Sequence, residues 1–179
     1  MNQREENIIP KPPGVKTLLL LRHAKSSWVD QGVDDFDRPL APRGLEAAPR
    51  MGKELKNLDL LPDLVVCSPA LRARQTFEAF ARAAGLKTEP VYEKRIYEAS
   101  AERLHSLARA FPESRQRVLM IGHNPGFENL ITLLTGRCER MPTAALACIR
   151  CSADTWKDVE EHEAYLQWLL RPKELANSG

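Results

Sequence analysis

Four side chains in three separate motifs are of the types that bind and transfer phosphoryl groups. Arg22 and His23 end one apolar run, Arg72 follows a second, and His123 ends a third. Guanidinium groups bind phosphate oxygens bidentately, and an imidazole can donate a hydrogen bond or act as a nucleophile. A neutral histidine attacking phosphorus in line would form a phosphoenzyme, which water then hydrolyses while cations stabilise the equatorial oxygens. Each residue alone is also compatible with a solvated strand end or helix surface. Whether they form a phosphoryl site therefore depends on whether the fold brings all four together.

The apolar runs before these residues predict buried strands of one sheet. Residues 17–22, 63–67 and 117–122 are short and apolar, and each run stops at polar residues. Helical patterns lie between them, and strands that alternate with helices predict a mostly parallel sheet. The carboxyl ends of parallel strands share one edge, where such folds bind their ligands. The four side chains should therefore meet at that edge.

Arg72 is expected in the first turn of a helix. Ser68 and Pro69 directly follow the second strand and have the types of an N-cap and a first-turn proline. Helical side chains point back toward the N-terminus, so the guanidinium can reach the sheet edge. The alternative is a surface arginine, although a cation there opposes the helix dipole unless an anion answers it.

The remaining pattern predicts a three-layer α/β/α sandwich, with a mostly parallel central sheet and helices on both faces. A helix is expected over residues 42–58, with Leu45 facing inward and a kink or break at Pro49. Asn124 and Pro125 have the types of the N-cap and first residue of another helix. Alternating residues near the C-terminus predict antiparallel strands at the end of the sheet.

The length and composition predict one catalytic domain over residues 17–173. A chain of 179 residues, 43% of them hydrophobic, can bury one sizeable core but is short for two domains. The charges, prolines and glycine of residues 1–16 predict a flexible N-terminal arm, and residues 174–179 are expected to form a tail.

The charge and hydropathy argue against several partners. A net charge of +2 gives no large basic field, so we expect neither nucleic acid nor a membrane surface as a partner. No apolar run reaches the roughly 18 residues of a membrane span, and the N-terminus lacks the order of a signal peptide. The four cysteines lack the spacing of a secreted disulfide framework. We therefore expect a cytoplasmic protein with free thiols, while the oligomeric state stays open.

Two polar segments lie where they could border the site. Residues 30–37 are dense in carboxylates and follow the first motif, so they either solvate themselves or cover the site as a lid or rim. Residues 93–100 form a polar connection after the third expected strand at 88–92. We expect these loops to shape access and specificity, because a shared scaffold varies its function there.

The three motifs occur in a specific order. Residues 21–26 are Leu-Arg-His-Ala-Lys-Ser, residues 67–76 are Cys-Ser-Pro-Ala-Leu-Arg-Ala-Arg-Gln-Thr, and residues 122–126 are Gly-His-Asn-Pro-Gly. In this order they resemble the Arg-His-Gly signature, the second arginine motif and the second histidine motif of the histidine phosphatase superfamily, also called phosphoglycerate-mutase-like. The resemblance extends from about residue 17 to residue 173.

Further segments resemble one subfamily. Arg-Pro-Leu at residues 38–40, Arg-Gly at 43–44 and Met-Pro-Thr-Ala-Ala at 141–145, together with the short chain, are most similar to the SixA-type phosphohistidine phosphatases. Val29 stands where mutases of the superfamily have a phosphate-contacting asparagine, which argues against a mutase.

The resemblance implies a role for each matched residue. His23 is implied as the phosphorylated nucleophile, and Arg22, Arg72 and His123 as the phosphate pocket. Ser26 is implied as a secondary phosphate contact in the substrate-binding set. No metal and no cofactor is expected, because the sequence lacks a P-loop and clustered carboxylate ligands.

The general acid has no clean match. The family's acid is a glutamate in the segment after the third strand, and Glu93 and Glu98 are both candidates that are equally compatible with simple solvation. An alkoxide leaving group needs a proton in the transition state, whereas a protonated phosphoimidazole departs as neutral imidazole. A poorly defined acid therefore favours a phosphoramidate over an alkyl phosphate.

These observations predict a metal-independent phosphatase that acts through a phosphohistidine intermediate. The expected substrate is a protein phosphohistidine, another phosphoramidate or a small phosphorylated molecule. The alternatives are a general phosphomonoesterase and a non-catalytic module that binds phosphate or a phosphoprotein.

Overall fold

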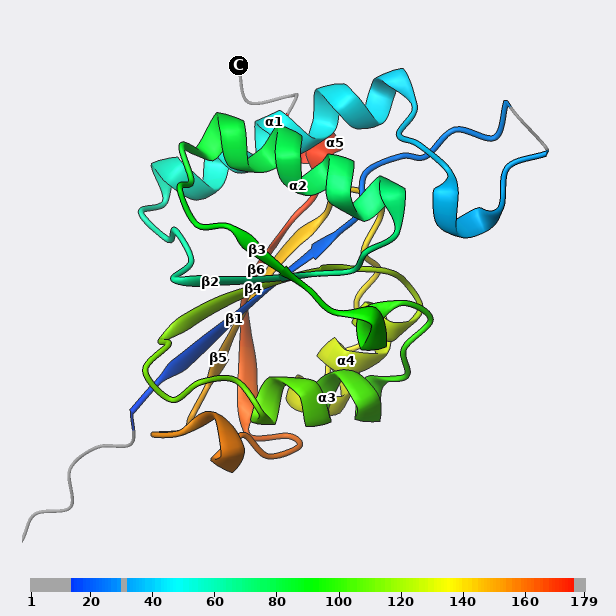
Figure 1. Ribbon diagram of the computed structural model, residues 1–179. Helices are drawn as coiled ribbons and strands as arrows, with labels where there is room; N and C mark the ends of the chain where they lie inside the picture. Colours follow the sequence, from blue (N-terminus) through cyan, green and yellow to red (C-terminus); the bar gives the residue numbers. More distant parts are fainter. Residues whose placement is uncertain (1–13, 30–31, 176–179) are drawn as a thin grey trace, which may run out of the picture.

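The protein is built around one mixed β-sheet, which a computed structural model describes for residues 14–29 and 32–175 (Figure 1). The strands are β1 Lys16–Arg22, β2 Leu64–Cys67, β3 Pro90–Tyr92, β4 Arg117–Gly122, β5 Leu146–Cys151 and β6 Ala164–Leu170. The helices are α1 Pro42–Asn57, α2 Leu71–Ala84, α3 Ala101–Arg109, α4 Gly126–Thr135 and α5 Pro172–Leu175, with short 3-10 turns at Asp35–Asp37, Lys94–Ile96 and Trp156–Asp158.

The helices form a layer on each side of the sheet. Figure 1 shows α1, α2 and α5 over one face and α3 and α4 over the other. The strand order is β3-β2-β4-β1-β5-β6, in which β3, β2, β4 and β1 pair in parallel and β5 and β6 add antiparallel pairs. The predicted α/β/α sandwich, with antiparallel strands at its end, is confirmed.

Strand β1 shows why its sequence is a continuous apolar run. Leu18 and Leu20 pack into the core under α3 and α4, whereas Leu19 and Leu21 pack into the core under α1 and α2. All four side chains are fully buried. Because both faces of the strand are covered, successive residues are apolar and do not alternate with polar ones.

Helix α1 differs from the sequence-based expectation at two positions. It continues through Pro49 without a break, and Leu45 is 52% exposed and does not face inward. The helix is held by Ala48, Met51 and Leu55, which are fully buried against the layer that includes α2. This packing outweighs the loss of the one backbone hydrogen bond that proline cannot donate.

Two helices begin later than their capping residues indicated. Helix α2 has Ala70 as its N-cap in place of Ser68, and α4 has Pro125 in place of Asn124. The Asn124 side chain instead donates to the Glu128 carboxylate and the Met141 carbonyl. Because the Asn124 side chain is used in these contacts, the local preference for asparagine as an N-cap does not set the first residue of α4.

The expected chain ends fall mostly outside the described residues. Residues 1–13 of the expected arm and 176–179 of the expected tail are not described, and Lys16, which was assigned to the arm, is the buried first residue of β1. Within the described part, no helix is long and apolar enough to cross a membrane, and the cytoplasmic location stays a prediction. The four cysteines are free thiols, as expected.

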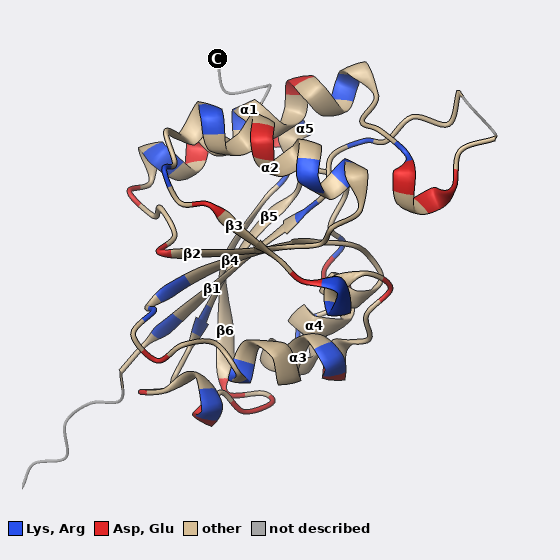
Figure 2. Ribbon diagram, in the orientation of Figure 1, with Lys and Arg blue, Asp and Glu red and all other residues tan. Residues whose placement is uncertain are grey.

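Charged residues of both signs are spread over the surface. Figure 2 shows Lys and Arg interspersed with Asp and Glu on the helices and loops of both layers. This mixture agrees with the small net charge of +2, so any strong anion attraction must be local.

Candidate active site

Three polar residues follow the ends of three adjacent parallel strands. His23 follows β1, Ser68 follows β2 and His123 follows β4. Their backbones continue the sheet for one residue, because His23 N–H donates to the Gly122 carbonyl at 3.0 Å and Ser68 N–H donates to the Ile121 carbonyl at 2.9 Å. The sheet itself therefore brings these three side chains to one edge.

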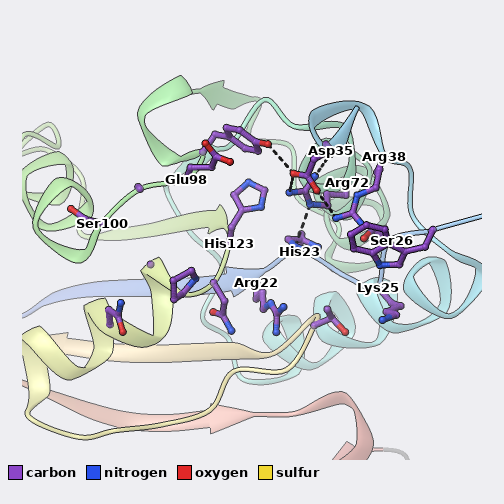
Figure 3. Close-up of a pocket in the computed structure, with 18 residues that line it drawn as sticks. Arg22, His23, Lys25, Ser26, Asp35, Arg38, Arg72, Glu98, Ser100 and His123 are labelled. Carbon is purple, nitrogen blue, oxygen red and sulfur yellow. Dashed lines mark hydrogen bonds and ion pairs between the residues drawn. The ribbon is translucent and has the colours of Figure 1, made fainter. Parts of the chain in front are cut away.

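His23, His123 and Arg72 meet above this edge (Figure 3). The two imidazole centroids are 5.1 Å apart, and Arg72 Nε lies 3.3 Å from His23 Nε2. All three residues are at least nine-tenths buried. We call these three residues and Ser68 the pocket floor. The cavity above it has a volume of about 890 Å³ and is also lined by Arg22 and Ser26.

The hydrogen bonds of His23 define its tautomer. Its Nδ1 lies 2.8 Å from the Ala24 carbonyl oxygen, which can only accept, so Nδ1 carries the proton. Nε2 is then unprotonated, and its lone pair accepts a hydrogen bond from Arg72 Nε–H. Burial, together with the neighbouring Arg72 and Arg22 charges, lowers the pKa of His23 to about 3, so the ring is neutral at pH 7.

His123 is held by a serine that sequence reasoning had taken for a helix cap. His123 Nε2 lies 2.7 Å from the Ser68 hydroxyl, which is fully buried. His123 Nδ1 is buried and has no hydrogen-bond partner among the described residues. Burial, together with His23 and Arg72, lowers the pKa of His123 to about 3. The available signal for Ser68 was its position directly after a strand, which it shares with both histidines.

Arg22 lines the same cavity. Its Nη1 donates to the Met141 carbonyl at 2.8 Å, which fixes the guanidinium, while its Nε is buried without a partner among the described residues. Burial lowers the pKa of this guanidinium from its ordinary value. Arg22 therefore has at least one N–H donor that no acceptor among the described residues occupies.

Asp35 borders the cavity and was missed as a site residue by sequence reasoning. Its carboxylate accepts from Arg72 Nη2 at 2.9 Å, from Arg38 Nη2 at 2.8 Å and from the Tyr97 hydroxyl at 2.8 Å. Its backbone carbonyl also accepts from Arg72 Nη1. Partial burial alone would raise the pKa of Asp35, but the Tyr97 hydrogen bond and Arg72 outweigh it and lower the pKa. The only sequence signal was the dense run of carboxylates after the first motif.

Aromatic side chains complete this side of the pocket. Tyr97 meets His123 edge-to-face at 5.4 Å and Phe36 at 5.2 Å, and the Arg38 guanidinium lies 3.5 Å from the Trp28 ring centroid. We call residues 32–38 and 97–100 the pocket rim. The acidic loop could either solvate itself or border the site, and its described part supports the second interpretation.

The structure separates the two acid candidates. Glu98 lines the cavity, is exposed and has a positive φ of 52°. Glu93 is not among the lining residues, and its carboxylate accepts from Arg95 Nη2 at 2.7 Å and from Arg95 N–H at 2.9 Å. These hydrogen bonds lower the pKa of Glu93, so it is an ionised cap of a short helical turn.

The part of the chain that the structure describes has no cluster of three or more His, Cys, Asp or Glu side chains that could hold a metal ion. The absence of a metal from the reaction stays a prediction, and the groups that line the cavity include the guanidiniums of Arg22 and Arg72 and the imidazoles of His23 and His123.

Fold and pocket together define an α/β enzyme class with two neutral histidines and two arginines at the carboxyl edge of its sheet. Such a pocket is suited to a phosphoryl group, because guanidinium charges and an imidazole donor complement phosphate oxygens. The chain belongs to the histidine phosphatase superfamily (branch 1), whose family model matches residues 18–130. The family expected from the three motifs is thereby confirmed.

Individual relatives agree with this assignment. An uncharacterized Mycobacterium tuberculosis protein, Rv1276c, is 34% identical over 152 residues, which cover 78% of this chain and 92% of that protein. A candidate phosphohistidine phosphatase SixA from Nakamurella multipartitia superposes with a TM-score of 0.80 at 28% identity, over 90% of this chain and 99% of the other. A candidate SixA from Agrobacterium tumefaciens gives 0.76 at 30% identity, over 91% and 100%. Together these similarities support a phosphatase of the SixA type.

Proposed function

We propose that this protein is a metal-independent phosphatase that forms a phosphohistidine intermediate on His23 and acts on phosphohistidine or another phosphoramidate. The observation that carries the proposal is the unprotonated Nε2 of His23, which accepts a hydrogen bond from Arg72 in a buried, neutral imidazole. The likeness to the two candidate SixA proteins supports the same substrate class.

The first step transfers the phosphoryl group to the enzyme. His23 Nε2 attacks phosphorus, the P–Nε2 bond forms and the bond from phosphorus to the substrate nitrogen breaks, so the leaving imidazole keeps the electron pair. The His23 Nδ1–H stays on the ring, and its hydrogen bond to the Ala24 carbonyl stabilises the positive charge of the phosphorylated ring. Water then attacks phosphorus, Nε2 leaves and inorganic phosphate is released.

Charge on the phosphoryl oxygens is stabilised by four groups. Arg22 and Arg72 supply guanidinium donors, and Ser26 is a further contact in the cavity lining. His123 acts as a neutral donor through Nδ1–H. Ser68 supports this tautomer, because its oxygen accepts from Ala70 N–H and its own hydrogen can go to His123 Nε2.

The acids near the pocket fit a leaving group that needs little proton assistance. Asp35 is held ionised by Tyr97 and Arg72, and Glu93 is paired with Arg95, so neither is suited to donate a proton. Glu98 is the acid candidate that borders the cavity, but it is exposed. A phosphohistidine that is protonated on its other ring nitrogen departs as neutral imidazole without such a donor.

Glu98 supports the second candidate function, a general phosphomonoesterase in which it protonates an alkoxide. Two peptides of identical sequence, one phosphorylated on histidine and one with phosphoserine at that position, separate the two functions. We expect kcat/KM to be at least about a hundredfold higher for the phosphohistidine peptide. Glu98→Gln should leave that value nearly unchanged, and Glu93→Gln, outside the cavity, is the matched control.

Equal rates on both peptides, with a large loss in Glu98→Gln on phosphoserine, would favour the phosphomonoesterase. Binding of both peptides without any turnover would instead favour a non-catalytic phosphate-binding or phosphoprotein-binding module.

A further inference from the structure

A second cavity adjoins the phosphoryl pocket. It has a volume of about 470 Å³ and lies between the start of α1, the loop before β5 and α5. It shares Lys25 and Thr143 with the pocket above His23, so the two cavities have a common wall. The residues that line it are Lys25, Arg43, Ala47, Pro142, Thr143, Arg171, Pro172, Lys173 and Glu174.

The charge of this cavity is strongly positive on a chain whose net charge is only +2. Arg171 is neutralised by ion pairs with Glu139 and Glu174 at 3.2 and 3.3 Å. Lys25, Arg43 and Lys173 are exposed, and none of them has an ion pair with a carboxylate among the described residues. Three cations thus lie at one hollow whose lining carboxylate, Glu174, is paired with Arg171.

The position of these cations relative to the nucleophile is fixed by the backbone. The Lys25 carbonyl accepts from Ala41 N–H at 2.8 Å, directly before α1. Gly44 in the first turn of α1 packs so closely that a Cβ on it would collide with the Lys25 carbonyl oxygen. The helix turn that carries Arg43 is therefore tied to the segment two residues after His23, and Figure 3 shows Lys25 at the margin of the pocket, away from the two histidines.

We propose that this cationic cavity is a second subsite that binds acidic side chains flanking the phosphorylated residue of a protein substrate. The inference rests on the proposed function, since it places the phosphorylated residue at His23. The phosphoryl group itself needs only the first pocket, whereas a polypeptide can cross the wall formed by Lys25 and Thr143 and lie in both cavities. The apolar side chains of Ala47 and Pro172 in the lining can contact the methylene groups of Asp and Glu side chains.

A pair of phosphohistidine peptides tests this subsite. The two peptides have the same length and differ only in their flanks, which carry Asp and Glu in one and Asn and Gln in the other. Exposed ion pairs are individually weak and screened by salt, so we expect kcat/KM to favour the acidic peptide by about tenfold at low ionic strength and less at high salt. The measured quantity is the ratio of the two kcat/KM values.

The variant Arg43→Glu/Lys173→Glu should bring this ratio to about one or below. Lys25 is left intact, because it also lines the phosphoryl pocket. The control Lys53→Glu/Lys87→Glu makes the same change in net charge at exposed lysines that line neither cavity, and it should retain the preference.

The outcomes separate the subsite from the proposed function. A ratio near one in the unmodified protein, or an equal fall of the ratio in both double variants, overturns the subsite while turnover of the peptides leaves the phosphatase intact. No turnover of either peptide overturns the proposed function first.

Discussion

The floor and the rim of the pocket are built in different ways, and the difference separates chemistry from selectivity. Floor residues His23, Ser68 and His123 follow directly on three paired strands, and their positions are set by the sheet. The rim consists of loop residues such as Asp35, Tyr97 and Glu98, of which Asp35 and Glu98 are exposed. Changes in the floor should therefore act on kcat, and changes in the rim should act on binding.

The largest loss outside the nucleophile is expected for Arg72→Ala. The substitution removes the cation beside His23 Nε2, which in the proposed mechanism stabilises charge in both transfer steps, so kcat should fall by about 10²–10³-fold or more. Arg74→Ala on the same helix is the matched control, because Arg74 is exposed and is not among the cavity-lining residues. Steady-state turnover of a phosphohistidine peptide measures the effect. A loss of kcat below about tenfold would contradict the placement of Arg72 beside the reacting phosphoryl group.

Ser68→Ala tests whether the serine acts through His123. Loss of the hydroxyl frees both ring tautomers of His123, so kcat should fall by about ten- to a hundredfold with little change in KM. The pH profile of kcat should shift in the same variant, because the pKa of His123 changes with its hydrogen bond. Ser106→Ala, at an exposed position of α3, is the control. If kcat and its pH profile were both unchanged, the role of Ser68 would be purely structural.

Asp35→Asn tests the rim. The Asp35 carboxylate occupies Arg72 and Arg38 donors that a phosphate oxygen could use, and it places a negative charge beside the pocket. Its removal should lower the Ki of inorganic phosphate by roughly three- to tenfold while kcat changes less than in the floor variants. A higher Ki would show that the carboxylate orders Arg72 for binding and does not compete with the ligand.

The smallest effect is expected in stability against pH. His23 and His123 have pKa values of about 3 when folded and an ordinary value of 6.5, so the unfolded chain binds more protons between these limits. The free energy of unfolding should therefore fall as the pH drops from 6.5 toward 3, by about 2 kcal/mol per imidazole at pH 5. Urea unfolding at pH 7 and pH 5 measures it. In the double variant His23→Gln/His123→Gln, the free energy of unfolding should decrease less between pH 7 and pH 5. An equal decrease would contradict the conclusion that both imidazoles are buried in the neutral form.

The sequence predicted the floor better than the rim for a physical reason. An apolar run that stops at a polar residue reports both a buried strand and the edge it points to, so His23 and His123 could be placed from local pattern alone. Ser68 was misassigned because a serine before a proline also satisfies a capping rule. Its real partner, His123, lies 55 positions away in the chain and is brought close only by the pairing of β2 with β4.

The rim contacts join residues that are far apart in the chain, so a short segment of sequence does not contain the information that predicts them. Asp35 contacts Tyr97 across 62 positions and Arg72 across 37, and each contact requires the loop conformation to be known. For the same reason, spacing could not separate Glu93 from Glu98, which lie five residues apart but differ in whether they face the cavity. Loop paths are set by packing and side-chain hydrogen bonds, which propensity does not encode.

The central claim is that His23 Nε2 carries the phosphoryl group, and covalent trapping tests it most directly. The protein is mixed with a phosphoramidate donor, quenched under alkaline conditions that preserve phosphohistidine, digested and mapped by mass spectrometry. We expect one phosphoryl group per active site on His23, formed before steady-state turnover and absent in His23→Ala. Turnover that continues in His23→Ala, or a phosphoryl group that maps to His123 and not to His23, would contradict the account.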